Sequence, residues 1–459
     1  MAGPLDPEDW PAFRAEAHKM LDAALDRLQN AADGPVWQPL PEDLKQRFTA
    51  PLPRKGGAAF ETLAAMLPYG VGNTHPRFFG WVHGAGTPTG LVADIAAGAM
   101  NANLGGRDHG AVYVEKQITA WVRGMFDFPE TASGLIVSGT SLATIVAVKT
   151  ARDRRSGFAS RKTGAGQGLV GYTSEQAHGC IARAFDILGL GTDALRLIPV
   201  DDSFRMDPAA LQTAIGADRA AGLTPFFVAG TAGTVNTGAI DPLDTIATIA
   251  ARETLWFHVD GAFGVSAILS DTLRHRLNGI TRADSIAFDF HKWLHVNYDA
   301  GFVLIRDGES HRAAFTLRPD YLKQGRALAA GNPWPVEYGP ELSRGNRAFK
   351  IWAQFTAHGT EALASAMERN VAQAQTLAAL VEAEPSLTLV PPVSLNIVCF
   401  SHRRANAEDI VAALQQQGIA APSTTVLDGR TVIRVNLTNH RTTEADLELL
   451  VREVVRLGV

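Results

Sequence analysis

Two residues of this sequence, Asp260 and Lys292, could do chemistry together. Asp260 ends the short apolar run 256–260, and Lys292 stands in the tripeptide HKW directly after the apolar run 285–290. Charged residues at the tips of short strands are how an α/β fold presents chemistry to a ligand. An aspartate can hold the proton of a pyridinium nitrogen, and a lysine can bond covalently to an aldehyde. The pair therefore predicts a site for pyridoxal 5'-phosphate (PLP).

Each of these residues also has a simpler structural explanation. Asp260 alone could be a helix cap, and Lys292 alone could be a solvated side chain. Their order along the chain, with HKW placed directly after an apolar strand, favours the chemical interpretation of the pair.

Other polar residues at predicted strand ends could surround such a cofactor. Thr140 and Ser141 lie where the strand 133–139 meets a helix, and free N–H groups with hydroxyls there form a phosphate site or merely a cap. His178, at a second strand-to-helix turn, could stack on a flat ring or could be a buried, hydrogen-bonded histidine. Thr234 follows another predicted strand and could offer its hydroxyl near the phenolic oxygen of the ring.

The composition predicts a globular protein and excludes several classes. Of the 459 residues, 46% are hydrophobic, the net charge is −5, and Lys and Arg form no notable cluster, which argues against a nucleic-acid partner. Cys180 and Cys399 are too few for a disulfide framework or a metal-ligand cluster, so we expect a reducing cytoplasm and no metal. The first twenty residues contain acids and no apolar core of the signal-peptide type, and we expect no transmembrane helix because no apolar run is long enough.

The pattern of elements predicts an α/β fold. Between about residues 133 and 305, apolar strands alternate with helical stretches, as in a mostly parallel sheet flanked by helices. Before it, two helices (about 6–30 and 58–66) and a Pro-rich extended arm carry apolar stripes without a core of their own, so they need the main body or a second subunit. After it, a long helix (about 347–384) leads into alternating strands and helices. We expect an N-terminal helical dimerisation arm (1–70), a large PLP-binding α/β domain (71–346) and a small α+β domain (347–459).

Taken in order, these pieces resemble the group II PLP-dependent decarboxylases, the family of aromatic-L-amino-acid decarboxylase and glutamate decarboxylase. The resemblance covers nearly the whole chain and rests on the stretches HPRFFGW, SGTSLAT, TSEQAH, AGT, HVDGAFG, DFHKWL, PDYLK and LTNHRTT. It implies a type I PLP-dependent transferase fold, like that of aspartate aminotransferase, in a homodimer with interwrapped N-terminal arms. It also implies that an L-amino acid, aromatic or related, loses its α-carboxylate to give an amine and CO2.

The same resemblance assigns roles to individual residues. Lys292 would bind the cofactor covalently, Asp260 would keep the pyridine nitrogen protonated, and His178 would stack on the ring and touch the substrate carboxylate. The remaining contacts would come from Ala262 under the ring, from Thr140 and Ser141 on the phosphate, and from Asp289 or His291 nearby.

The chain departs from the family pattern at two places. Val235 stands where the family often has a second threonine, which reduces the hydroxyl groups near the ring. The Pro- and Gly-rich segment 322–340 predicts a mobile lid, but Trp334 or Pro335 stands where aromatic decarboxylases of the family carry a proton-donating tyrosine. Tyr338 could take that catalytic role or could only pack the loop. In the family, loss of the donor goes with oxidative deamination to an aldehyde.

The substrate pocket is expected from the stretches FFGWVHGAG and MNANLGGRDH. Phe79 and Trp81 would form aromatic walls. The polar residues nearby are His83, Asn103, Arg107 and His109, and each of them could instead be a contact of the dimer interface.

Other functions remain open at this point. A decarboxylating oxidase that makes an aldehyde, or an aminotransferase, would use the same fold and cofactor. Arg434 on the stretch TVIRVNL could bind an α-carboxylate, as aminotransferases of this fold require. A PLP-fold protein that only binds its ligand is a further alternative, and the intact pair of Asp260 and Lys292 argues against it.

Overall fold

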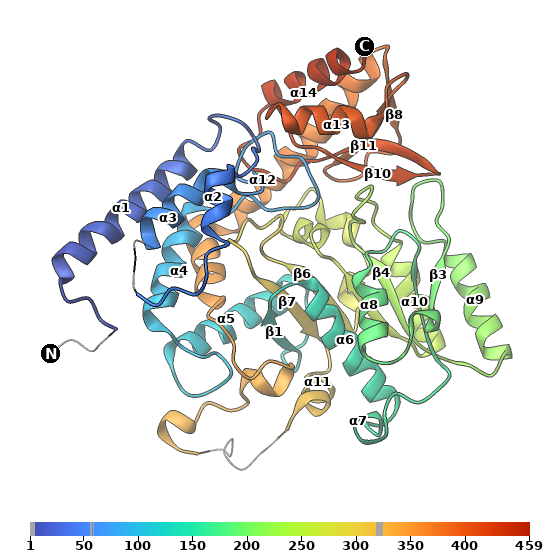
Figure 1. The fold of residues 1–459 in the computed structure, drawn as a ribbon. Helices are drawn as coiled ribbons and strands as arrows, with labels where there is room; N and C mark the ends of the chain where they lie inside the picture. Colours follow the sequence, from blue (N-terminus) through green and yellow to red (C-terminus); the bar gives the residue numbers. More distant parts are fainter. Residues whose placement is uncertain (1–4, 56, 58, 318–324) are drawn as a thin grey trace.

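A seven-stranded sheet forms the centre of the protein, in the order β1-β7-β6-β5-β4-β2-β3 (Figure 1). The structure is a computed structural model that describes residues 5–55, 57, 59–317 and 325–459. The strands are β1 (Ser133–Val137), β2 (Leu169–Ser174), β3 (Leu195–Ile198), β4 (Thr224–Thr231), β5 (Trp256–Asp260), β6 (Ser285–Asp289) and β7 (Gly301–Ile305). Neighbours run parallel except at β7, which is antiparallel to β1 and β6, so the mostly parallel sheet is confirmed.

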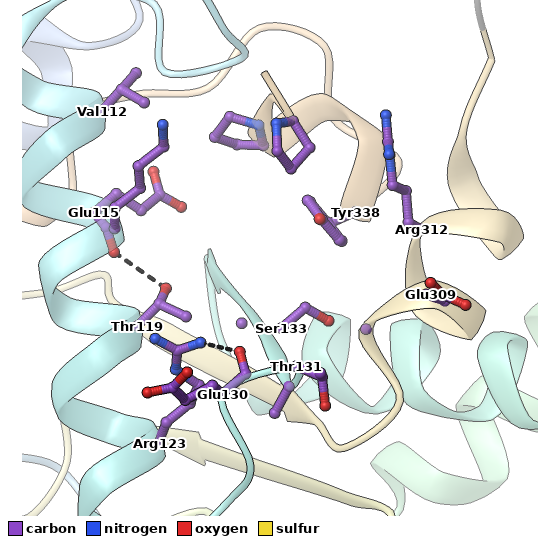
Figure 2. Close-up of a pocket in the computed structure, with 16 residues that line it drawn as sticks. Val112, Glu115, Thr119, Arg123, Glu130, Thr131, Ser133, Glu309, Arg312 and Tyr338 are labelled. Atoms are coloured by element: carbon purple, nitrogen blue, oxygen red, sulfur yellow. Dashed lines mark hydrogen bonds between the residues drawn. The ribbon is translucent and has the colours of Figure 1, made fainter. Parts of the chain in front are cut away.

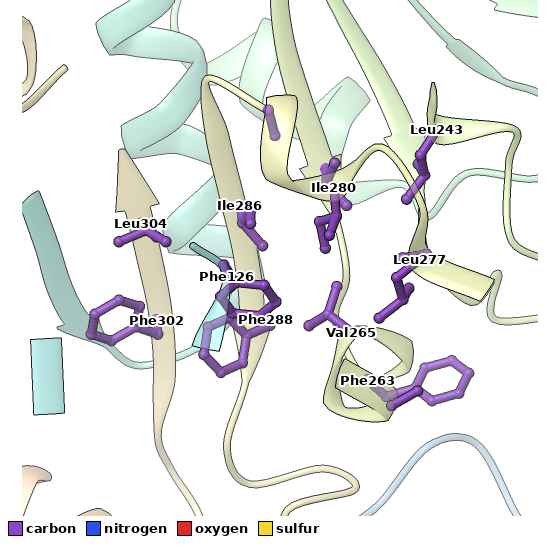
Figure 3. Close-up of a cluster of buried hydrophobic side chains, with 14 of the residues drawn as sticks. Phe126, Leu243, Phe263, Val265, Leu277, Ile280, Ile286, Phe288, Phe302 and Leu304 are labelled. Carbon is purple, nitrogen blue, oxygen red and sulfur yellow. The ribbon is translucent and has the colours of Figure 1, made fainter. Parts of the chain in front are cut away.

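Helices cover both faces of this sheet because its strands are apolar on both sides. Ile286 and Phe288 of β6 belong to one buried cluster, whereas Ala287 between them belongs to another on the opposite face. Figure 3 shows the first cluster, in which Phe288 packs against Phe126 and Phe302. The helices of this region are α4 (Pro88–Met100), α5 (Gly110–Met125), α6 (Thr140–Arg155), α7 (Ser160–Thr163), α8 (Cys180–Ile187), α9 (Pro208–Ala220), α10 (Leu243–Glu253) and α11 (Gly308–Phe315).

A smaller antiparallel sheet, ordered β10-β11-β9-β8, follows the long helix α12 (Ala348–Ala383), which is interrupted at Gly359 with a φ of 71°. Its elements are β8 (Leu387–Val390), β9 (Ile397–His402), α13 (Ala407–Gln416), β10 (Ser423–Leu427), β11 (Arg430–Asn436) and α14 (Glu444–Leu457). Thr443 and Asp446 cap α14, since the Thr443 amide donates to Asp446 Oδ2 at 2.9 Å. This C-terminal part lies at one end of the large sheet (Figure 1).

The N-terminal segment consists of α1 (Trp10–Gln29), α2 (Glu42–Arg47) and α3 (Ala59–Met66), which lie along the side of the molecule near α4 (Figure 1). The segment between α1 and α3 was expected to be extended throughout. This prediction is wrong in one detail, because the segment contains the short helix α2. Acidic residues in its first turn and basic ones in its last favour this short helix. Among the described helices, none is long and apolar enough to cross a membrane.

Candidate active site

The carboxyl ends of parallel strands bring the predicted residues to one edge of the large sheet. β4, β5 and β6 end at Thr231, Asp260 and Asp289, and Thr231 lies beside Asp260 in the register. Gly301 of β7 lies opposite Asp289, and a Cβ there would stand 2.4 Å from Gly139 Cα. Glycine at this position therefore lets the amino terminus of α6 approach the ends of β6 and β7.

Two cavities open at this edge, and we call them the lysine cavities because both include Lys292. Their volumes are about 340 and about 240 Å³, and they share four lining residues, His178, Ala262, Lys292 and Tyr298. The larger also contains the amino terminus of α6, with Thr140, Ser141, Asp289 and His291; the smaller contains Asp260, Trp81 and His83. The structure thus brings together most of the residues that the sequence indicated.

Lys292 and Asp289 form an ion pair at the centre of the site. Lys292 Nζ lies 2.8 Å from Asp289 Oδ2, and the other carboxylate oxygen accepts the Thr140 amide at 2.6 Å. His291 Nδ1 accepts the Ala300 amide at 2.9 Å, so its other nitrogen carries the proton and lies 3.7 Å from Asp289. Burial lowers the pKa of His291. The lysine amine is therefore held at one place before any ligand enters.

The amino terminus of α6 has the features of a phosphate site. Thr140 is 5% exposed, and its hydroxyl is buried without a hydrogen-bond partner. Ser141 lines the same cavity, beside helix amides that have no intrahelical acceptor. A phosphate there would give Thr140 the partner it lacks, while Asp289 already occupies the amide of Thr140. The residues present fit the phosphate of PLP.

Asp260 has the surroundings expected of a partner for a pyridinium nitrogen. It is 1% exposed and accepts hydrogen bonds from the Cys180 thiol at 3.5 Å and the Ala262 amide at 3.2 Å. Burial and the negative charge of Asp260 raise the pKa of Cys180. The thiol therefore stays protonated and acts as the donor in its hydrogen bond to Asp260. No ion pair among the described residues includes Asp260, and a buried carboxylate without a cation fits a cationic ligand.

His178 and Ala262 line both lysine cavities. His178 is exposed, and its Nδ1 accepts the Cys180 amide at 3.2 Å, which fixes the ring at the beginning of α8. An imidazole and a methyl group facing one cavity leave space for a flat ring. Both positions agree with the predicted contacts of a cofactor ring.

The segment Trp81–His83 lies directly over Lys292. A Cβ at Gly84 would stand 2.2 Å from the Lys292 carbonyl oxygen, so only glycine permits this approach. The segment is fixed from the C-terminal part of the chain: Asn436 donates to the Trp81 carbonyl at 2.6 Å, and Thr438 donates to the His83 carbonyl at 2.8 Å. Burial and the charge of Lys292 lower the pKa of His83.

Four predicted site residues do not line the lysine cavities: Phe79, Asn103, Thr234 and Tyr338. Phe79 is 1% exposed and packs into the hydrophobic cluster of the C-terminal part. The Asn103 side chain accepts the amides of Gly105 and Arg344, so it holds a loop. The Thr234 hydroxyl lies 2.9 Å from that of Thr237, in a turn that carries it away from the site.

Tyr338, the predicted proton donor, lies in a different cavity. Figure 2 shows it with residues of α5, β1 and α11, around a volume of about 570 Å³ that we call the Tyr338 cavity. His311 donates to its backbone carbonyl at 2.7 Å, and the neighbouring Glu337 pairs with Arg312 at 2.6 Å. The predicted mobile lid (322–340) begins within 318–324, which lie outside the described residues. In its described part, residues 335–338 pack on α11. Within its own chain, Tyr338 therefore does not reach Lys292.

Arg107, His109 and Arg434 do not line the lysine cavities. Arg107 stacks over the Trp334 ring at 4.6 Å, and His109 Nε2 lies 3.3 Å from the Asn103 carbonyl. Arg434 is 3% exposed and donates to the carbonyls of Trp81 and Asn236 instead of lining either lysine cavity. Burial lowers the pKa of Arg434 to about 10.

Sequence reasoning missed Thr231 and Tyr298. Thr231 is the last residue of β4, lines the smaller lysine cavity and has a buried hydroxyl without a partner. The rule that active residues follow strand ends could have found it. Tyr298 lies in the loop between β6 and β7. The one signal in the sequence that could have indicated Tyr298 is that the same loop contains Lys292. Within the described residues, no group of three or more His, Cys, Asp or Glu could hold a metal ion.

The mostly parallel sheet, the small C-terminal sheet and the pair of Asp260 and Lys292 at the strand ends define a PLP-dependent enzyme of fold type I. Comparison with known proteins gives the family. The pyridoxal-dependent decarboxylase conserved domain matches residues 41–403, and the chain belongs to that family. It is a PLP-dependent carboxy-lyase that decarboxylates an amino acid.

Three similar proteins cover nearly the whole chain. An aromatic-L-amino-acid decarboxylase of Bacillus atrophaeus is 32% identical, over 97% of this chain and 95% of its own length. An L-2,4-diaminobutyrate decarboxylase of Rhizobium meliloti is also 32% identical, over 95% and 90%. The structure of Oryza sativa TDC with PLP and tryptamine matches with a TM-score of 0.89 at 27% identity, over all of both chains. The two decarboxylases are equally identical to this chain but are named for different substrates. The substrate of this enzyme is therefore inferred from the residues of its site.

Proposed function

We propose that this enzyme removes the α-carboxylate of an aromatic or related L-amino acid and releases the amine and CO2. The observation that carries the proposal is the smaller lysine cavity, where Lys292 and Asp260 share the space with a wall of rings from Trp81, His83 and Tyr298. The ring centroids of Trp81 and His83 lie 5.7 Å apart in a stacked arrangement. Such a wall suits a flat, apolar substrate side chain.

The residues of the chain divide the work as follows. Bound PLP would supply an electron sink for the electron pair left at Cα. Asp260 would keep the ring nitrogen protonated, and Lys292 would hold the cofactor until the substrate amino group replaces it. Thr140 and Ser141 would hold the phosphate. His178 would orient the substrate so that the bond from Cα to its carboxylate stands perpendicular to the ring and is the bond that breaks.

One observation supports an alternative product. Tyr338 does not reach the lysine cavities in its own chain, and Val235 replaces a hydroxyl in the smaller one. A site without an effective proton donor would favour oxidative deamination, which releases an aldehyde. The aminotransferase alternative receives less support, because Arg434 is engaged with backbone carbonyls.

A direct experiment tests the proposed function. The PLP-loaded enzyme is incubated with each standard amino acid and with L-2,4-diaminobutyrate, and CO2, amine, aldehyde and hydrogen peroxide are measured. We expect one CO2 and one amine for each molecule of an aromatic substrate consumed. Hydrogen peroxide and aldehyde in place of amine would establish the oxidase, and pyruvate-dependent turnover without CO2 would establish an aminotransferase. Preference for diaminobutyrate would reject the aromatic substrate class.

The same proposal includes a homodimer in the cytoplasm, with an arm (1–70), a large domain (71–346) and a small domain (347–459). α1 has no buried residue although it carries Trp10 and Phe13, and Ile95 and Met100 of α4 are about half exposed. An apolar groove of about 740 Å³ runs between α4, α5 and α12. A second copy would cover these surfaces. Light scattering at micromolar concentration tests this, and an active monomer would refute it.

A further inference from the structure

Tyr298 lies at the centre of the active site without a role so far. It lines both lysine cavities, and among the tyrosines in the described part of the chain it is the one that does so. The residue is 47% exposed, and the space it faces includes the cavities that contain Lys292. Tyr298 therefore shares both cavities with Lys292.

The tyrosine is held firmly while its hydroxyl is left available. Its ring lies 4.2 Å from that of His291 and 5.7 Å from that of His83, between centroids. Its backbone carbonyl accepts the Lys350 amine at 2.9 Å, and the next residue, Asp299, pairs with Arg347. No described residue forms a hydrogen bond with the hydroxyl. Burial and the charge of Asp289 raise the pKa of Tyr298, so the phenol carries its proton at neutral pH.

The other groups around the cavities are less suited to give a proton to carbon. His291 uses one ring nitrogen to accept the Ala300 amide and directs the other towards Asp289. Burial lowers the pKa of His83, so its ring is neutral. Two competitors remain. Lys292 would have a free amine once substrate had replaced it on the cofactor, and His178 lines both cavities and carries a proton on the ring nitrogen that does not accept the Cys180 amide.

We propose that Tyr298 is a catalytic residue that donates the proton to Cα after CO2 has left. The O–H bond of Tyr298 breaks, a C–H bond forms with the electron pair left at Cα, and the phenolate regains a proton from water. The substrate loses CO2 and gains one proton, which gives the amine. This inference rests on the proposed decarboxylation and names the residue that decides its product.

Loss of this donor has a defined chemical consequence. The electron pair at Cα then persists long enough to reduce dioxygen. Two electrons pass to dioxygen, which becomes hydrogen peroxide with two protons, and water hydrolyses the resulting imine to an aldehyde and ammonia. Tyr298 therefore controls the ratio of amine to aldehyde, a property that a purely structural residue would leave unchanged.

The test compares wild type, Tyr298→Phe and the matched control Tyr69→Phe, each loaded with PLP. The probe is the amino acid that releases CO2 fastest from the wild type among the standard amino acids. Amine, aldehyde and hydrogen peroxide are measured per CO2 in air. We expect the amine-to-aldehyde ratio of Tyr298→Phe to fall by at least about tenfold and that of Tyr69→Phe to stay at the wild-type value.

Two further measurements separate the chemical role from a binding role. The product amine is incubated with each holoenzyme in D2O, and exchange of its α-hydrogen is followed by NMR; Tyr298→Phe should slow this exchange by about 10²-fold or more, because a general acid contributes about 10²–10⁴-fold. PLP affinity, titrated by absorbance on the cofactor-free protein, should change less than about twofold.

The outcomes decide between the alternatives. An unchanged product ratio and unchanged exchange in Tyr298→Phe would overturn the proposal and leave Lys292, His178 or water as the donor. A large loss of PLP affinity with an unchanged ratio would overturn it in favour of a phosphate contact. A wild-type enzyme that releases no CO2 would refute the proposed function itself, and one that releases CO2 with mainly aldehyde would refute only the role of Tyr298.

Discussion

The lysine cavities and the Tyr338 cavity are hollows in the same protein with different surroundings. The Tyr338 cavity is the larger, at about 570 Å³ against about 340 and about 240 Å³. Two of the charged residues that line it form ion pairs: Glu115 pairs with Arg344 at 2.6 Å, and Arg312 pairs with Glu337. Around Lys292, by contrast, the hydroxyls of Thr140 and Thr231 are buried without partners.

Here the smaller cavities, and not the larger one, contain the residues with the chemistry of a PLP site, and two of their hydroxyls are buried without partners. A buried hydroxyl without a partner is costly to the folded protein, so its presence indicates a ligand that supplies the missing contact. The charged pairs around the Tyr338 cavity hold the segment 335–338 in place. Matched substitutions in the two kinds of cavity test whether they differ in function.

The largest effect is expected from Lys292→Ala. The variant should lose the visible absorbance of covalently bound PLP, and turnover should fall at the upper end of the roughly 10²–10⁴-fold range that acid–base groups contribute, or further. Lys116→Ala removes the same side chain from the Tyr338 cavity and should stay within about threefold of wild type. CO2 release and absorbance spectra measure both variants. Full activity in Lys292→Ala would remove the basis of the assignment.

Asp260→Ala should have the second largest effect. It removes the carboxylate that keeps the cofactor nitrogen protonated, and the loss of kcat should be on the order of 10²–10³-fold, as for other preorganised electrostatic groups. Glu309→Ala, in the Tyr338 cavity, is the matched control and should leave kcat close to wild type. A loss below about threefold in Asp260→Ala would show that the nitrogen is held by another group.

His311, which lies beside the Tyr338 cavity, should have a smaller effect, on the pH dependence of the stability of the folded protein. Burial lowers the pKa of His311 to about 3, and its Nδ1 accepts from Ser133 at 2.8 Å. The unfolded chain binds this proton near the ordinary histidine pKa of about 6.5, so the folded protein loses stability as pH falls below that value, by up to about 1.4 kcal/mol per pH unit.

The unfolding temperature Tm tests this expectation. It should fall between about pH 8 and pH 5.5 in the wild type and fall less in His311→Gln. His18→Gln, on the exposed surface of α1, should keep the wild-type slope. An identical slope in His311→Gln would show that this histidine does not take part in the acid sensitivity of the fold.

The smallest effect is expected from Tyr338→Phe. Its ring packs on His311 at 5.1 Å between centroids and lies outside the lysine cavities, so the amine-to-aldehyde ratio should remain that of the wild type. Product analysis under the conditions used for Tyr298→Phe measures this directly. A strong rise in aldehyde would place Tyr338 at the active site, for instance that of a second subunit.

The fold and the centre of the site were predictable because each depends on short stretches of sequence. Asp260 ends one apolar strand, and Lys292 comes shortly after another. The carboxyl ends of parallel strands lie at the same edge of a sheet, so the two residues were expected to lie close together. The alternation of strands and helices predicted the large sheet, although it did not show that β7 runs antiparallel to its neighbours.

The substrate side could not be predicted because it depends on contacts between distant segments. Phe78 and Phe79 are adjacent, yet Phe78 stacks on His83 whereas Phe79 enters the core of the C-terminal part. Their opposite directions are set by pairing of Phe79 with Ala421 and Asn436, far along the chain. The turn after β4, with Gly233 at a φ of 92°, likewise places Thr231 in the cavity and turns Thr234 away.

The central claim, that Lys292 is the residue to which PLP binds covalently, can be measured directly. The PLP-loaded protein is reduced with borohydride, digested, and its peptides are weighed by mass spectrometry. We expect that only the peptide containing Lys292 gains the mass of the reduced cofactor. A modification found on another lysine, or none on Lys292 in a protein that binds PLP, would contradict it.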